Sequence, residues 1–391
     1  MRIAILGSYF WPHAYGIEKI MYAHAKHLAE RGHAVEVVTT RLRFPAGIDP
    51  DLPACEPHEA FTIRRLRVVV RAPPFFVHYP GKGGLILTGL QRALRDHRPD
   101  VVHVHGISAA ALALGGALYA RRERAAFFYS VYHHPRRLRL DAIRKSLLRA
   151  MNYLPLRTAS KIYFLTARDF GTFSADYGYA PRERFASLLT GAEPRGATRS
   201  PTAARTRLNL LFVGRVDDAR KGFAILETAV DALSADLRAA FVLTVVGTIG
   251  AATRQRLETK YGAAIRVLGP VSEPDLEQAY ADADVFVMPS LYEGFGMPYI
   301  EAMRYGIPVI GTNSGGTPEI VPPETGLLPP PGDAAAVSAA IARLLTDPDL
   351  RRRMGSAGEA WSKRFMWGAI IEGLEADYRS AVEGLATNGR R

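Results

Sequence analysis

The chain has 391 residues, 48% of them hydrophobic, which is enough for two domains with buried cores. Its single cysteine, Cys55, excludes an intrachain disulfide bond, and its longest run of small apolar residues, 108–120, is too short to span a membrane. The first 200 residues carry 30 Lys and Arg against 15 Asp and Glu, so the net charge of +12 comes from this half. The excess of positive charge in this half predicts an anionic partner. The chain has no zinc-ligand spacing, aromatic RNA-binding signature or recognition-helix motif, so we expect that this partner is not a nucleic acid.

The first elements predict a strand–helix–strand unit. Residues 2–6 form a short apolar strand, followed by a loop at 8–15. Gly16 then opens a helix with apolar residues at helical spacing, and the next strand lies at 35–39. The unit lacks the G-x-G-x-x-G fingerprint, so dehydrogenase chemistry is not favoured. The first apolar run is too short for a signal peptide, and we expect a soluble, cytoplasmic protein.

Further strands follow in the first half, and histidines stand at the ends of two of them. The proline-rich residues 41–84 contain one expected strand, at 62–70. After them we expect a helix at 85–95 and strands at 100–106, 126–132 and 160–165. His105 ends one strand, and His133 and His134 end another. Doubly wound folds bind ligands at the carboxyl edge of the sheet, which makes these histidines candidates. The alternative, that each is a hydrogen-bonded structural histidine, stays open.

Residues 136–157 predict a basic amphipathic helix. An apolar stripe runs through it, and seven Lys and Arg surround the stripe against one Asp. That pattern is typical of a helix on an anionic membrane surface. It also fits a helix packed on the sheet with a solvated basic face, and we prefer this second interpretation.

A linker and a second domain follow. Residues 194–206 are rich in Arg, Ala, Thr and Pro and predict the linker. The elements expected after it are strands at 208–213, 241–246 and 265–268 and helices at 223–233, 275–283, 333–345, 348–365 and 367–382. Arg215 and Lys221 follow the first of these strands, where a guanidinium fork and an ammonium group suit phosphate oxygens. The alternative is that Arg215 pairs with Asp217 or Asp218.

The stretch 285–319 combines a strand, two glycine turns and two carboxylates. A buried strand at 285–288 leads into a turn at Gly294–Gly296, and a helix begins at Pro298. Glu293 precedes the turn, and we place Glu301 in the first turn of the helix. Backbone amides at such a turn and helix start attract phosphate, and carboxylates accept hydrogen bonds from hydroxyls, so the pair suits a sugar nucleotide. The alternative is that Glu301 only complements the helix dipole and Glu293 is a solvated loop charge.

Three pieces of the second half together resemble the retaining GT-B glycosyltransferases of family four. EGFGMPYIE, with Glu293 and Glu301 separated by seven residues, is similar to their E-x7-E signature. GGTPEIV at 315–321 is similar to the segment that follows that signature. FVGRVDDARKG at 212–222 is similar to their GRL…KG element, in which the Arg and the Lys hold the donor diphosphate.

The resemblance implies an α/β chain of the GT-B type, with two doubly wound Rossmann-like domains facing a central cleft. It implies an acceptor-binding domain at 1–195, a nucleotide-sugar-binding domain at 205–365, and a last helix, 366–391, that crosses back to the first domain. The first half departs from the pattern at two places. Tyr15 replaces the first of a pair of glycines before the helix, and T-G-A-E at 190–193 replaces an N-G-V-D turn.

Roles are carried over position by position. The residues assigned to catalysis are Glu293, His133, Arg215 and Lys221. The residues assigned to the donor are Gly16, Arg215, Lys221, Val271, Glu293, Gly294, Phe295, Gly296, Met297 and Glu301. Among them Glu301 is assigned to the ribose hydroxyls, Glu293 to the donor sugar and Val271 to the base. Asp282 and Asp284 mimic a metal-binding D-x-D motif but lie between a helix and a buried strand, so we interpret them as structural.

The resulting hypothesis is a retaining, metal-independent hexosyltransferase. It moves a sugar from a nucleoside-diphosphate sugar to a hydroxyl of a small-molecule, glycan or lipid-linked acceptor. No cofactor and no metal ligand are expected, because fixed cations take the place of a divalent ion. Two alternatives remain: a sugar-nucleotide epimerase on the same fold, which needs no acceptor, and a non-catalytic nucleotide-sugar-binding protein. A peripheral contact with an anionic inner-membrane face also stays open.

Overall fold

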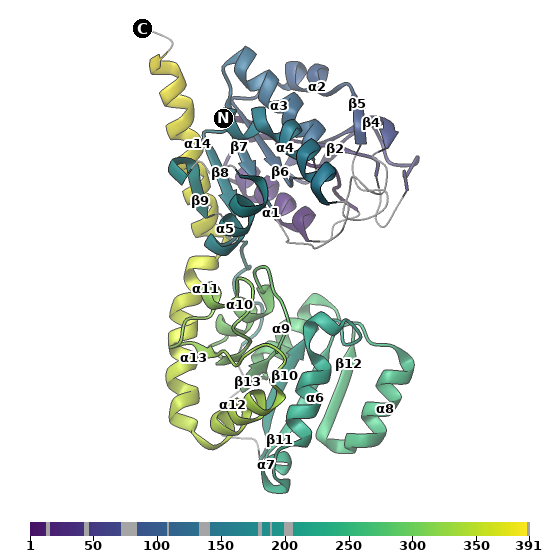
Figure 1. Cartoon of the computed structure of the whole chain (residues 1–391), viewed down its shortest axis with the longest axis vertical. Helices are drawn as coiled ribbons and strands as arrows, with labels where there is room; N and C mark the ends of the chain where they lie inside the picture. Colours follow the sequence, from purple (N-terminus) through teal and green to yellow (C-terminus); the bar gives the residue numbers. More distant parts are fainter. Residues whose placement is uncertain are drawn as a thin grey trace. The chain divides into compact units, whose positions relative to one another are not determined.

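The computed structural model describes residues 1–12, 16–42, 47–71, 84–107, 109–132, 141–178, 182–187, 190–198 and 206–388. The chain divides into two units, one made of Met1–Thr190 with Trp367–Arg391 and the other of Gly191–Met366 (Figure 1). The sequence placed the first boundary at 195–205 and the second at 365–366. The predicted His133 and His134, Tyr15, and residues 136–140 of the basic segment lie outside the described residues.

The first unit is built on a nine-stranded sheet in the order β3-β4-β2-β1-β6-β7-β8-β9, with β5 paired to β4. Its strands are β1 (Arg2–Leu6), β2 (Ala34–Thr40), β3 (Cys55–His58), β4 (Phe61–Arg71), β5 (Gly84–Thr88), β6 (Val101–His105), β7 (Ala126–Ser130), β8 (Lys161–Phe164) and β9 (Phe185–Ser187). Its helices are α1 (Ile17–Glu30), α2 (Leu90–His97), α3 (Ala110–Glu123), α4 (Asp141–Thr158), α5 (Ala167–Tyr177) and α14 (Trp367–Asn388).

Alternation along the central strands gives this sheet two buried faces. Ile3 and Ile5 of β1 belong to one apolar cluster, and Ala4 and Leu6 to the other. The first cluster is covered by α1 and α14, and the second by α2, α3, α4 and α5. Helices on both faces of a mainly parallel sheet make a doubly wound unit.

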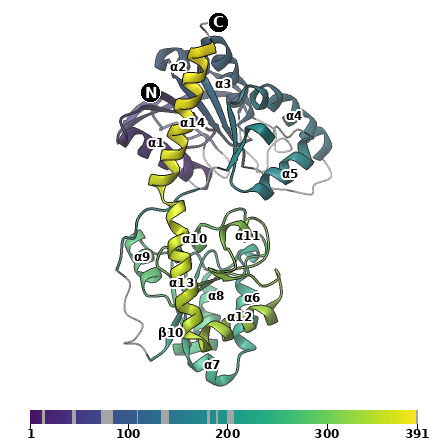
Figure 2. The ribbon, with the colours of Figure 1, turned by 90° about the vertical axis from the view of Figure 1, so that its left-hand side faces the viewer.

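Helix α14 belongs to the first unit although it closes the chain. It packs against α1 and β7, and Figure 2 shows it running beside α1. The Arg31 guanidinium of the loop after α1 donates to the Glu375 carboxylate at 2.7 Å. The hydrogen bond from Arg379, and then that from Arg31, hold the pKa of Glu375 down to about 2, although desolvation alone would raise it. The packing of α14 and the ion pairs of Glu375 thus attach the end of the chain to the first unit.

One element of the first half was predicted wrongly. Residues 84–88 form strand β5, paired antiparallel to β4, instead of the start of a helix. Helix α2 begins only at Leu90, because Gly89 takes a left-handed conformation with φ of 90° and breaks the chain direction. The apolar run fitted both structures, and the pairing partner decided between them. Of the described helices, none is long and apolar enough to cross a membrane.

The second unit carries a six-stranded parallel sheet in the order β12-β11-β10-β13-β14-β15. Its strands are β10 (Leu208–Val213), β11 (Phe241–Val246), β12 (Ile265–Gly269), β13 (Val285–Val287), β14 (Val309–Ile310) and β15 (Gly326–Leu327). Its helices are α6 (Phe223–Asp231), α7 (Ala235–Ala239), α8 (Ala251–Tyr261), α9 (Glu273–Ala281), α10 (Met297–Met303), α11 (Thr317–Ile320), α12 (Ala334–Thr346) and α13 (Pro348–Ser362). β10 and β11 have the predicted bounds.

Candidate functional site

The candidate site lies at the carboxyl edge of three neighbouring strands of the second unit, β10, β13 and β14. Each strand is followed by a glycine-containing turn: 214–222 after β10, 289–296 after β13 and 311–317 after β14. Loops that leave adjacent parallel strands at the same edge meet in space, and open α/β sheets bind their ligands there. The predicted Arg215, Lys221 and Glu293 come from these turns.

The first turn brings Lys221 to Glu293. Gly222 has φ of 71°, and a Cβ placed on it would lie 1.9 Å from the carbonyl oxygen of Pro289, so only glycine allows this approach. Lys221 Nζ donates to Glu293 Oε1 at 2.6 Å, and Ser290 Oγ donates to the same oxygen at 3.1 Å. Glu293 is therefore oriented from two sides, and a half-buried ammonium group is fixed at the edge of the sheet.

The third turn fixes the backbone of the same glutamate. The Gly316 N–H donates to the Glu293 carbonyl oxygen at 2.8 Å. Gly315 has φ of 59°, and a Cβ on it would lie 1.9 Å from that same oxygen. The turn after β14 thus supports Glu293 from behind, and this support requires a glycine.

Arg215 lies on the same turn as Lys221, in an exposed position. Its guanidinium donates to Asp218 Oδ2 at 2.5 Å, which is the pairing that the sequence left open as an alternative. Arg220 binds the same carboxylate through two nitrogens, at 3.0 and 2.7 Å. Arg220 and then Arg215 hold the pKa of Asp218 well below its usual range. The turn thus carries three cations, with Lys221 paired to Glu293 and both arginines sharing Asp218. Its other carboxylate, Asp217, accepts hydrogen bonds from Gly250 and Thr253 and from none of these cations in the contacts described.

Glu301 lies elsewhere on helix α10 than predicted. The helix begins at Met297, so Glu301 is its fifth residue and no acidic residue occupies the first turn. The simple interpretation as a dipole partner therefore does not apply. Tyr280 OH donates to Glu301 Oε2 at 2.6 Å. Burial, and then the nearby Glu301 charge, raise the pKa of Tyr280 well above its usual range, so this tyrosine stays a hydrogen-bond donor.

The other predicted donor residues fall into different surroundings. Phe295 is buried and packs edge-on against Phe365, with 6.0 Å between ring centroids, so its side chain fills the core. Gly296 caps α10 with φ of 89°, and Gly294 and Met297 lie on either side of this segment, half-buried. Val271 is half-buried in the loop after β12, two strands away from β10.

In the first unit, Gly16 is exposed and forms the N-cap of α1, while His133 lies outside the described residues. In the D-x-D pair, Asp284 accepts a hydrogen bond from the Asn209 N–H at 2.8 Å and is buried, which fits the structural interpretation.

Sequence reasoning missed a cluster of three buried histidines. His24, His103 and His105 come together on the α1 face of the first sheet. His105 had been noted only as a residue at a strand end. The signal that could have found part of it is the V-H-V-H alternation of β6, which puts His103 and His105 on one face. Nothing local in the sequence joins His24 to them.

Comparison with known protein families shows the family to which the chain belongs. The family model described as glycosyl transferases group 1 matches residues 197–361, and that of glycosyltransferase family 4 matches residues 14–184. The chain is a glycosyltransferase of the group 1 and family 4 type. The expected family is confirmed, and the two matches fall on the two units.

Two relatives of this glycosyltransferase are named as mannosyltransferases. MMP alpha-(1->4)-mannosyltransferase of Mycolicibacterium hassiacum is 25% identical over 423 residues, which cover 99% of this chain and 100% of that protein. O-antigen chain mannosyltransferase B of Escherichia coli is 45% identical over 103 residues, covering 26% of this chain and only 27% of that protein. The match to this second relative thus spans about a quarter of its length.

Solved structures give the fold of the glycosyltransferase. Sucrose-phosphate synthase from Thermosynechococcus elongatus matches with a TM-score of 0.71 and 22% identity, covering 98% of this chain and 99% of that one. Anabaena HepE in complex with UDP also matches with a TM-score of 0.71, at 18% identity, covering 97% and 100%. The predicted GT-B fold, with its two parallel-sheet domains, is confirmed.

Proposed function

We propose that this glycosyltransferase moves a hexosyl group from a nucleoside-diphosphate sugar to an acceptor hydroxyl, with retention of the anomeric configuration and without a divalent ion. The observation that carries the proposal is the Lys221–Glu293 pair, held at 2.6 Å where β10 and β13 end. A cation fixed next to a hydroxyl-accepting carboxylate suits a ligand that is both anionic and rich in hydroxyls.

The cations of the 214–222 turn are assigned to the donor diphosphate. When the anomeric C–O bond breaks, negative charge develops on the leaving diphosphate, and a positive group already in place stabilises it without reorganisation. Lys221 supplies a point charge and Arg215 a planar fork. Arg215 is mostly exposed and Asp218 is shared with Arg220, so Arg215 can turn to a phosphate while Arg220 keeps Asp218 paired. Fixed charge of this kind makes a divalent ion unnecessary.

The carboxylates are assigned to hydroxyl groups of the donor. Glu293 is placed against the donor sugar, where its backbone is already fixed by Gly316 and its carboxylate by Lys221. Glu301, which Tyr280 holds, is placed against the ribose hydroxyls. The backbone amides of Gly294–Gly296 and Met297 are assigned to the donor as well, and Val271 to the base.

From the first unit we assign Gly16 to the diphosphate and His133 to the donor sugar, as the family resemblance implies. For retention we propose a front-face route. The bond from the anomeric carbon to the diphosphate oxygen breaks, the acceptor oxygen bonds to that carbon on the same face, and the leaving phosphate oxygen takes the acceptor's proton. The acceptor is a small molecule, a glycan or a lipid-linked sugar.

The test is a panel of nucleoside-diphosphate hexoses incubated with EDTA and a library of hydroxyl acceptors. GDP-mannose comes first, because the named relatives are mannosyltransferases. We expect one donor to be consumed in EDTA, with a product whose anomeric configuration, read by NMR, matches that of the donor. Isomerisation of the donor with no acceptor present would indicate the epimerase instead. Nucleotide binding without any transfer, or activity restored only by Mg²⁺ or Mn²⁺, would contradict the proposal.

A further inference from the structure

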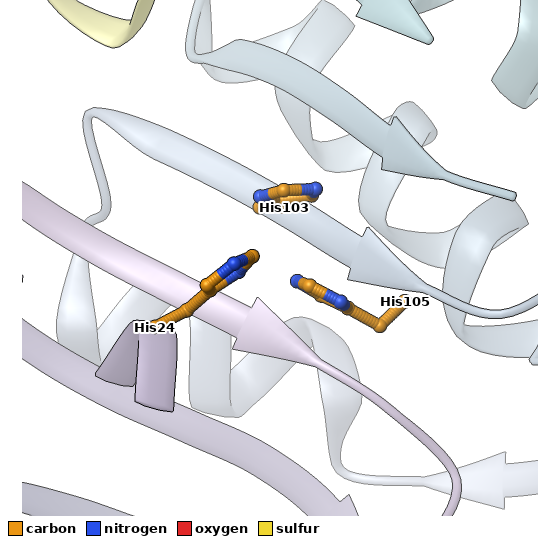
Figure 3. Close-up of side chains that lie close together, drawn as sticks. All are labelled: His24, His103 and His105. Atoms are coloured by element: carbon orange, nitrogen blue, oxygen red, sulfur yellow. The ribbon is translucent and has the colours of Figure 1, made fainter. Parts of the chain in front are cut away.

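The three buried histidines of the first unit come from two elements. His103 and His105 are two residues apart on β6 and face the same side of the sheet, and His24 reaches them from α1 (Figure 3). All three side chains are almost completely inaccessible, with exposed fractions of 0%, 2% and 0% for His103, His105 and His24. Each offers a ring nitrogen, and these nitrogens lie within 4.8 Å of one another.

The hydrogen bonds of the cluster are incomplete. His105 Nδ1 is held by Tyr132 OH at 2.9 Å, and its Nε2 has no partner. Both ring nitrogens of His24 are buried without a partner. Each buried polar atom without a hydrogen-bond partner lowers the stability of the fold by about 1–3 kcal/mol. Three such atoms in one cluster therefore indicate that the cluster binds a further group.

We propose that His24, His103 and His105 form a binding site for a late first-row transition metal ion of the zinc class. Neutral imidazole is the preferred ligand of such ions. Metal binding requires neutral rings, and the burial of three imidazoles beside one another favours the neutral form. The arrangement of His105, one nitrogen held by a hydroxyl and the other facing the cluster, is the one that metal-binding histidines commonly show.

The three ring nitrogens need to move only slightly closer together to bind a metal ion. Zn–N bonds of about 2.0–2.1 Å in a tetrahedral site put the ligand nitrogens roughly 3.4 Å apart, against at most 4.8 Å here. His24 and His105 have free nitrogens for this. His103 bonds Tyr378 OH at 2.5 Å and Ser130 Oγ at 2.8 Å, so it joins the site by exchanging one of these hydrogen bonds for the metal. The fourth position is left to water or to one of the nearby hydroxyls.

The role that follows is structural. A metal ion here would tie α1 to the central strand β6, and the Tyr378 contact extends this link to α14. The cluster shares no residue with the groups assigned to the transfer reaction. It also differs in chemistry, because Mg²⁺ and Mn²⁺ prefer oxygen ligands.

The experiment compares metal binding in the full chain and in two histidine variants. The wild-type protein, stripped with chelator and dialysed, is titrated with Zn²⁺ while bound metal and melting temperature are measured. We expect one tightly bound Zn²⁺ per chain and a rise of several degrees in Tm, because the ion binds only the folded state. Co²⁺ should give visible d–d absorption. The ring of Trp367 lies 5.7 Å from that of His24, so Cu²⁺ should quench its fluorescence.

His24→Leu is the test variant and His27→Gln the matched control. His27 lies on the same helix with its ring 5.9 Å from that of Trp367, but it is outside the cluster. We expect His24→Leu to lose the Zn²⁺-dependent Tm rise and the Co²⁺ spectrum while folding without metal at least as stably as wild type, since it removes two unpaired polar atoms. Absence of stoichiometric Zn²⁺ binding in the wild type, or equal binding in His24→Leu and His27→Gln, would overturn the proposal.

Discussion

Two groups of polar side chains at the ends of parallel strands differ in almost every physical property. In the second unit, Lys221, Glu293 and Arg215 are charged, paired and partly accessible. In the first unit, the histidines near the end of β6 are neutral and buried, and some of their nitrogens are unpaired. The same position in a doubly wound sheet therefore offers two different environments. An accessible charged edge suits a charged substrate, and a closed neutral edge suits a metal ion or a packed core.

The two units also differ in the sequence separation of the residues that their contacts join. The contacts of the charged edge join segments of one domain, and Lys221 and Glu293 are 72 residues apart. The first unit uses the end of the chain, where Tyr378 reaches His103 across 275 residues and Glu375 reaches Arg31 across 344. The first domain thus depends on residues that no local pattern connects to it.

The largest effect is expected from adding a Cβ atom at Gly315, next to the backbone of Glu293. In Gly315→Ala the added Cβ would meet the Glu293 carbonyl oxygen in a left-handed conformation. We expect a loss of roughly 3 kcal/mol or more in unfolding free energy, together with a strong fall in kcat/KM, because the turn must move. Gly373→Ala, on the exposed side of α14 with nothing near its Cβ, should instead stabilise by about 0.5–1 kcal/mol. Denaturant unfolding of both variants measures this, and a neutral Gly315→Ala would show that the turn is not constrained.

A smaller effect is expected from acid acting on the neutral edge. Burial, and then the nearby His27 charge, lower the pKa of His24 from 6.5 to about 3. The unfolded chain therefore binds more protons than the folded chain between these values, and stability falls as the pH drops below 6.5. At pH 5 this one imidazole should cost about 2 kcal/mol relative to neutral pH. In EDTA, His24→Leu should lose about that much less stability than wild type between pH 7 and pH 5. Parallel pH curves would rule out the buried neutral state.

The smallest effect is expected at the link between the histidines and α14. Tyr378→Phe removes the hydroxyl bonded to His103 Nδ1 and leaves that buried nitrogen unpaired. We expect a loss of about 1–2 kcal/mol in unfolding free energy with little change in kcat/KM. Tyr153→Phe serves as the control, because Tyr153 is exposed and bonds only Arg157 among the contacts described. Its change should stay within about 0.5 kcal/mol. Equal effects in the two variants would mean that the His103 bond contributes nothing.

The sequence predicted the sheet of the second unit better than the sheet of the first. Apolar runs such as 208–213 and 241–246 have one interpretation, a buried parallel strand, and the structure has the same bounds. Residues 85–88 were interpreted as helix because their strand partner, β4, is not visible in a local pattern. The residues of the candidate site were predicted one by one from a resemblance, and the Arg215–Asp218 pairing was an open alternative, but the Lys221–Glu293 pairing was not foreseen. The Lys221–Glu293 bond depends on Gly222 and Gly315 allowing backbones to approach, and such packing appears only in three dimensions.

The central claim is that a fixed cation at the carboxyl edge of β10 stabilises the charge that develops on a leaving diphosphate. The most direct measurement is kcat/KM for Lys221→Ala beside Lys260→Ala, in which a lysine paired to Glu227 and Asp231 is lost from the same unit. We predict a fall of about 30- to 1,000-fold for Lys221→Ala, corresponding to roughly 2–4 kcal/mol of barrier, and less than about threefold for Lys260→Ala. Circular dichroism confirms that both are folded. Full transfer activity in folded Lys221→Ala would contradict the account.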